Sequence, residues 1–186
     1  MLCERLIQPP ANDDPALAPL PSAQRIQDLL FDAARLGRVD VLPALLRAGA
    51  DIDARDRAGY TPLILASYHG HEHATAMLLA TGAQVDRPDA ARGNTALMGV
   101  AFKGHGGIAA RLLAAGAEPN RTNHAGQTAL MMAALFGRSA IVDQLLMHGA
   151  DASSRDIAGN SARSVAEAQG NDVMVARLDR ASFGKV

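Results

Sequence analysis

The densest group of side chains able to do chemistry is a run of three histidines within five residues: His69, His71 and His73. Neutral imidazoles are common ligands of zinc and nickel, so this spacing is compatible with a metal site in a metal- or redox-responsive protein. Gly70 interrupts the run, and a glycine in such a place tends to end a helix, so the three side chains need not converge. We therefore expect packing and local hydrogen bonding from these histidines, and we keep a metal site as an alternative.

No set of residues has the spacing of a catalytic centre. Cys3, the one cysteine, has no histidine near it in the sequence and so lacks the base that a thiol nucleophile needs. A single cysteine also excludes an internal disulfide and a cysteine-rich zinc site. The segment Gly104-His105-Gly106-Gly107 has the glycines of a phosphate-binding loop, but no Lys-Ser or Lys-Thr pair follows it. The sequence predicts neither an enzyme nor a cofactor.

Composition narrows the classes of partner. The 186 residues carry 18 Lys and Arg against 19 Asp and Glu, a formal net charge of -1, which is not the basic footprint of a general nucleic-acid binder. No run of about 18 apolar residues could span a membrane, and residues 1–8 lack the core of a secretion signal. We expect a cytoplasmic monomer. The 16 Arg against 2 Lys are typical of a high-GC, bacterial source.

Glycines recur at a fixed interval along the chain. Gly-Ala pairs, turn glycines and helix-ending glycines each form a series with steps of 33 residues and a single step of 34. The three series are Gly49, Gly82, Gly116 and Gly149; Gly59, Gly93, Gly126 and Gly159; and Gly37, Gly70, Gly104, Gly137 and Gly170. A repeat of this length is typical of a solenoid built from stacked units.

Each unit has the pattern of a turn followed by two short helices. In one unit, Gly59 supplies the positive φ of a tight turn, and Thr61 stands where a hydroxyl caps the next helix. That helix is expected over 63–68 and the second over 71–80, each ended by a glycine. Aromatic residues make up only 3% of the chain, so we expect thin aliphatic layers between closely packed helices.

These units resemble the ankyrin repeat. The motifs that carry the resemblance are Gly59-Tyr60-Thr61-Pro62-Leu63, Gly70-His71 and Leu78-Leu79-Ala80-Thr81-Gly82-Ala83, each matched less fully in two further units. The resemblance covers about residues 25 to 180 and implies an all-α ankyrin-repeat solenoid with projecting hairpin-like turns. The sequence departs from the family where a histidine usually links neighbouring repeats: the residues there are Ile64, Met98 and Met131.

The chain then divides into a leader and one domain of five units. Residues 1–22 form a Pro-rich leader that we expect to be extended or disordered. Residues 23–186 form the repeat domain, with an N-terminal cap over 25–55, full repeats over 56–88, 89–122 and 123–155, and a C-terminal cap over 156–180. Arg163 stands where the full repeats carry leucine, because a cap has no neighbour to cover its outer face.

The resemblance to the ankyrin family implies a concave binding face, built from the turn tips and the exposed side of each first helix. Four of the six aromatic residues fall at the positions that form this face. Exposed aromatics mark interaction sites, and the alternative is that they pack against neighbouring turns and stiffen the stack. The residues expected to bind a partner are Tyr60, Tyr68, His69, Phe102, Lys103, Leu135, Phe136, Arg57, Arg92 and His124.

The sequence therefore predicts a non-enzymatic scaffold that binds a partner protein on its concave face. Arginines along the turn tips favour a partner with exposed carboxylates, and the aspartates between them disfavour nucleic acid. These arginines are Arg55, Arg57, Arg87, Arg92, Arg121 and Arg155. One alternative is a small inhibitor or immunity-type regulator of an enzyme. A second, less favoured, is a metal- or redox-responsive protein using His69, His71 and His73 or Cys3.

Overall fold

The computed structural model describes residues 21–183, so Cys3 and nearly all of the leader expected over 1–22 lie outside the described residues. Residues 21–183 form ten α-helices and no strand, which confirms the all-α class. The helices follow one another in pairs: α1 (Ala23–Leu36) and α2 (Leu42–Arg47), α3 (Pro62–Tyr68) and α4 (Glu72–Ala80), α5 (Ala96–Lys103) and α6 (Gly106–Ala114), α7 (Ala129–Leu135) and α8 (Ser139–Met147), α9 (Ala162–Ala168) and α10 (Asp172–Phe183).

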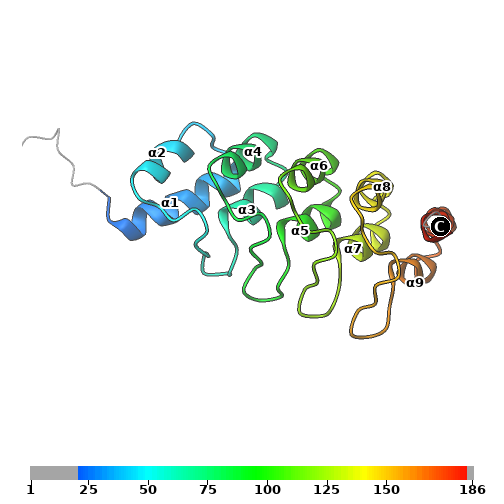
Figure 1. The fold of residues 1–186 in the computed structure, drawn as a ribbon. Helices are drawn as coiled ribbons and strands as arrows, with labels where there is room; N and C mark the ends of the chain where they lie inside the picture. The colour runs from blue at the N-terminus through cyan, green and yellow to red at the C-terminus, as the bar shows by residue number, and fades with distance from the viewer. Residues whose placement is uncertain (1–20, 184–186) are drawn as a thin grey trace, which may run out of the picture.

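The pairs stack side by side into an elongated solenoid (Figure 1). The first helices of the pairs, α1, α3, α5, α7 and α9, form one row in which each contacts the next. The second helices form another row alongside, and long turns project from the first row to one side. This is the solenoid of helix pairs with projecting turns that the sequence predicts. We propose the same five-unit division for the folded chain, because each unit then contains one helix pair, with α1 beginning at Ala23 and α10 ending at Phe183, just outside the expected bounds of the two caps.

Hydroxyl caps start α3, α5, α7 and α9. The side-chain oxygens of Thr61, Thr95, Thr128 and Ser161 accept the backbone N–H three residues ahead at 3.2, 3.4, 3.3 and 3.2 Å. The three threonines are buried, so water cannot replace these bonds easily. Each cap lies two residues after a turn glycine, and Gly59 has the expected positive φ of 88°. The spacing of glycine and hydroxyl therefore predicted where these helices begin.

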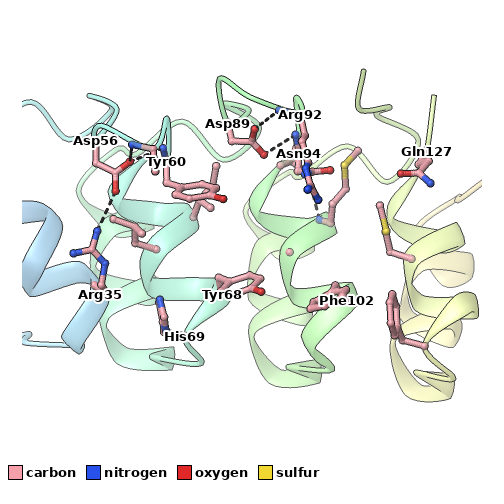
Figure 2. Close-up of a pocket in the computed structure, with 18 of the residues that line it drawn as sticks. Arg35, Asp56, Tyr60, Tyr68, His69, Asp89, Arg92, Asn94, Phe102 and Gln127 are labelled. Carbon is pink, nitrogen blue, oxygen red and sulfur yellow. Dashed lines mark hydrogen bonds and ion pairs between the residues drawn. The ribbon is translucent and has the colours of Figure 1, made fainter. Parts of the chain in front are cut away.

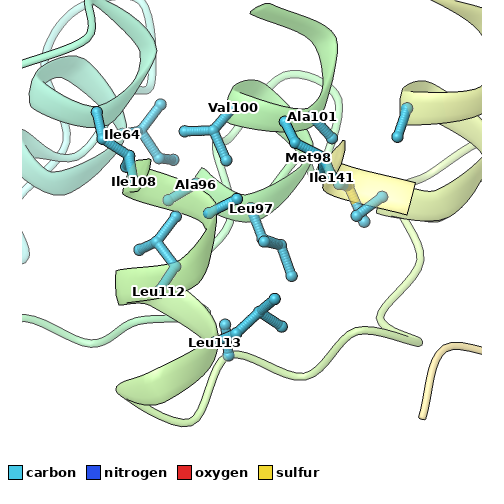
Figure 3. Packing of buried hydrophobic residues seen from close by; sticks show 14 of the residues in the cluster. Ile64, Ala96, Leu97, Met98, Val100, Ala101, Ile108, Leu112, Leu113 and Ile141 are labelled. Carbon is cyan, nitrogen blue, oxygen red and sulfur yellow. The ribbon is translucent and has the colours of Figure 1, made fainter. Parts of the chain in front are cut away.

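Aliphatic and small side chains fill the space between the two rows of helices (Figure 3). One leucine position repeats through the full repeats and is at most 1% exposed: Leu63, Leu97 and Leu130. The next residue in each is also buried, so an apolar side chain takes the position where the family commonly has a histidine. In the last unit Arg163 is exposed and its Nε donates to Asp179 at 2.7 Å. The outer face of the last pair is therefore polar at this position, as expected of a cap.

A side-chain oxygen at one repeated position holds each projecting turn. Asp56 Oδ1 accepts the backbone N–H groups of Ala58 and Tyr60 at 3.0 and 2.9 Å. The equivalent residues Asp89, Asn123 and Asp156 accept backbone N–H groups of their own turns. Neighbouring turns are joined as well, because the Ala90 N–H donates to the Gly59 carbonyl at 3.1 Å. The turns thus form a continuous wall, in which these Asp and Asn side chains fix the turn geometry.

Candidate functional site

A groove lies between the wall of turns and the exposed side of the first-row helices (Figure 2). It has a volume of about 520 Å³ and extends from α1 to α7. Its floor is apolar, with Ile64, Leu65 and Met98 among the lining residues, and polar groups of the turns form one side. A groove of this size and composition suits side chains of another molecule.

Three aromatic rings follow one another along this groove, and we call Tyr68, Phe102 and Phe136 the aromatic ladder. Tyr68 and Phe102 are stacked with centroids 6.2 Å apart and planes 9° apart. Phe102 meets Phe136 edge to face at 4.6 Å. The three rings are 37%, 37% and 41% exposed. They lie there because each occupies one of the two residues before a helix-ending glycine, where the last turn of the first helix faces the concave side.

Seven of the ten residues expected to bind a partner line the groove: Tyr60, Tyr68, His69, Arg92, Phe102, Leu135 and Phe136. Lys103 lies at its edge, with Nζ 5.0 Å above the centre of the Tyr68 ring. Arg57 and His124 are exposed but do not line it. The His124 ring instead lies close against Gly93, and its backbone N–H donates to Arg92 at 2.9 Å, because these two turns pack together. His124 therefore supports the wall of turns rather than the groove.

Only some of the six turn-tip arginines are left free to meet the carboxylates of a partner, since Arg121 lies 3.6 Å from Glu118 and two others bind backbone carbonyls. The Arg55 guanidinium donates twice to the Pro88 carbonyl, at 3.1 and 2.8 Å, and so ties two turns together. The Arg155 guanidinium donates to the Gly159 carbonyl at 2.7 Å. These two side chains are held by hydrogen bonds to backbone carbonyls of the turns. By contrast, no partner for the side chains of Arg57 and Arg92 occurs among the described residues.

Sequence reasoning missed an ion pair at one end of the groove. Arg35 lies 3.0 Å from Asp56, and both line the groove (Figure 2). The repeat period could have found Arg35, since it precedes Gly37 by the same two residues that separate Tyr68 from its own glycine. The place of the buried Met98 on the groove floor could not be predicted, because a methionine there has the same sequence pattern as a core residue.

Of the three clustered histidines, His71 has the expected hydrogen-bond partner, His69 has ring contacts, and His73 is exposed with no partner among the described residues. His71 Nε2 lies 2.9 Å from the Arg35 carbonyl, and His105 Nε2 lies 3.3 Å from the Tyr68 carbonyl. His69 and His71 rings are 6.3 Å apart, and no cluster of three His, Cys, Asp or Glu residues able to hold a metal occurs in residues 21–183. Desolvation lowers the pKa of His69, and His71, Arg35 and Lys103 lower it further by repulsion.

Comparison with known proteins relates the chain to repeat proteins. A family model described as ankyrin repeats, three copies, matches residues 30–123 and 89–156. None of the helices in the described range is long and apolar enough to cross a membrane.

Curated relatives match over shorter segments. The chain is 39% identical over 83 residues to a probable E3 ubiquitin-protein ligase (XBOS33) of Oryza sativa subsp. japonica, covering 45% of this chain and 16% of that protein. It is 42% identical over 64 residues to ankyrin repeat domain-containing protein SAT10 of Stachybotrys chartarum, covering 34% and 3%. It is 48% identical over 52 residues to cyclin-dependent kinase 4 inhibitor B of Bos taurus, covering 28% and 40%. The match spans less than half of each relative.

Proposed function

Because the chain belongs to the ankyrin-repeat family, we propose that it is a non-enzymatic scaffold that holds a partner protein in its concave groove. Ankyrin repeats generally mediate protein–protein interaction, and the aromatic ladder is the observation that carries the assignment to this face. Three contiguous rings, each more than a third exposed, lie in one groove. Aromatic side chains that dock a partner contribute most of the binding energy in many interfaces. We place the scaffold in the cytoplasm as a monomer.

The groove is held in shape before any partner arrives. The wall of turns is fixed by side-chain caps such as Asp56 and by backbone hydrogen bonds between turns. The ladder rings support one another, which limits the rotamers of Phe102 in the free protein. A preorganised surface loses little conformational entropy on binding, so more of the contact energy appears as affinity.

The composition of the groove supports a binding role rather than catalysis. In the described part of the chain, no serine or cysteine lines the groove, and His69 is its only imidazole. The hydroxyl of Thr95 accepts a backbone N–H as a helix cap and is buried. The ankyrin family is generally non-catalytic, which agrees with this chemistry.

A second candidate function is inhibition of an enzyme. One of the matched relatives is a cyclin-dependent kinase 4 inhibitor, and the 52 matched residues are 48% identical. A scaffold that seats an enzyme's surface loop in the groove would block access to that enzyme. If a captured partner is an enzyme, its activity should fall when the purified scaffold is added at equal concentration.

The test compares affinity purifications from lysate of the source cells. The bait is the tagged full-length protein, beside the variants Phe102→Ala/Phe136→Ala and Met147→Ala/Val173→Ala. The second variant is a matched control, since both of its side chains are exposed apolar residues outside the groove, on α8 and α10. The ladder variant should bind the partner about 30-fold more weakly, a loss of about 2 kcal/mol, while the control binds normally. Equal recovery by all three would refute the groove as the binding site.

A further inference from the structure

The carboxylates that line the groove are already engaged in hydrogen bonds and an ion pair. Both oxygens of Asp56 are engaged, since Oδ1 accepts two backbone N–H groups and Oδ2 receives Arg35 at 3.0 Å. Asp89 is 3% exposed and accepts backbone N–H groups with both oxygens, from Arg92 at 2.6 Å and Asn94 at 3.0 Å. Among residues 21–183, these two are the only carboxylates that line the groove. A bound segment therefore meets little free acceptor charge.

Donor groups, by contrast, remain available. The Asn123 amide donates to the side-chain carbonyls of Asn94 and Gln127, at 2.9 and 3.1 Å. Asn94 and Gln127 line the groove, and this pairing leaves their NH₂ groups without a partner among the described residues. The Arg92 guanidinium is unpaired in the same range. The turn side of the groove thus offers one cation and two amide donors.

The opposite side is cationic as well. Lys103 lies 5.0 Å above the Tyr68 ring, and the His69 ring meets the same tyrosine edge-on at 5.7 Å. Lys103 has no carboxylate partner in residues 21–183. The groups that face His69 are Tyr68 and His71 from its own unit, Arg35 from α1 and Lys103 from α5. Besides desolvation, the charged groups among them lower the pKa of His69, which is the effect of a positive local field.

We propose that the groove takes up an acidic, apolar segment of a protein, with an Asp or Glu carboxylate between His69 and Lys103 and an aliphatic or aromatic side chain against Phe102. A second carboxylate of the segment reaches Arg92 on the turn side. This inference rests on the proposed function, because it names the chemistry of the partner for the same groove. It also moves the anion-recognising groups away from the turn tips at Arg55 and Arg155, where backbone carbonyls occupy the arginine side chains.

The test uses a random-peptide phage library selected on the immobilised full-length protein at near-physiological salt. Peptides from the wild type should be enriched about tenfold in Asp and Glu over Lys and Arg, with apolar residues between them. The variant Lys103→Glu/Arg92→Glu should lose that preference or reverse it. Arg47→Glu makes the same kind of charge change on α2, outside the groove, and should select the same acidic peptides as the wild type.

A second readout is the titration of His69 by NMR, with one selected acidic peptide present. Because a nearby carboxylate stabilises the imidazolium, the pKa of His69 should rise on binding. If the selected peptides depend on Phe102 but show no acidic bias, or if they leave the pKa of His69 unchanged, the inference is contradicted while the proposed function stands. If no selected peptide depends on Phe102, both the inference and the proposed function are contradicted.

Discussion

Close packing between neighbouring turns should make one glycine far less replaceable than another of the same conformation. Gly59 has φ of 88° and Gly82 has φ of 95°, and both belong to the same repeat. A Cβ added at Gly59 would lie 2.7 Å from the Ala90 Cβ and 3.1 Å from the Ala90 backbone nitrogen. A Cβ added at Gly82 would have nothing within 4 Å. The two alanine variants therefore separate conformational strain from steric conflict between turns.

The expected magnitudes follow from those distances. Gly82→Ala carries only the left-handed backbone strain of about 1–2 kcal/mol, partly offset by the lower entropy of the unfolded chain. Gly59→Ala carries the same strain plus an overpacking cost of about 1–3 kcal/mol, because the turn that begins after Pro88 must move. Gly59→Ala should thus be the less stable variant by about 1–3 kcal/mol.

The assay is urea unfolding followed by circular dichroism at 222 nm, with the midpoint and slope fitted for each variant. Similar slopes would allow the midpoints to be compared as free energies. Equal destabilisation by Gly59→Ala and Gly82→Ala would refute the reasoning, since it would mean that neighbouring turns do not pack tightly enough to preform the groove wall.

Three further outcomes are expected. Phe102→Ala/Phe136→Ala should keep its helical spectrum yet lose about 1–3 kcal/mol of stability in urea, because the ring contacts of the ladder are lost; loss of helicity would show that the rings belong to the core. Thr61→Ala should cost about 1–2 kcal/mol in the same assay, since it removes a buried helix cap, and an unchanged midpoint would contradict that role. The pKa of His69 in the folded protein lies below the usual histidine value, so in the unfolded chain this histidine takes up its proton at a higher pH. The free energy of unfolding should therefore fall as the pH drops below about 6.5. His69→Gln should flatten that decline in a pH series of unfolding midpoints, and an identical slope would count against the low pKa.

The local rules of the repeat could be read from the sequence. Glycine spacing and the hydroxyl two residues later fixed the start of α3 to within a residue, because capping and left-handed turns are properties of a few neighbouring residues. The same period placed Tyr68 and Phe102 on one face, since stacking repeats the environment of each position. Both are short-range or strictly periodic effects.

Contacts between units were harder to foresee. The Arg55 side chain reaches the Pro88 carbonyl 33 residues away, and nothing in a single repeat shows that this carbonyl is open. The position of Lys103 over Tyr68 likewise depends on how two helices are offset in the stack. His124 illustrates the same limit, because its contact with Gly93 exists only once adjacent turns are packed.

The central claim is that the partner is held in the concave groove, and site-specific photocrosslinking tests it most directly. A photoreactive p-benzoylphenylalanine is introduced as Phe102→p-benzoylphenylalanine in one sample and Met147→p-benzoylphenylalanine in another, since Met147 is exposed on α8 outside the groove. The protein that co-purifies with the wild type should crosslink to position 102 and not to position 147. Crosslinking at position 147 with none at position 102 would contradict the account.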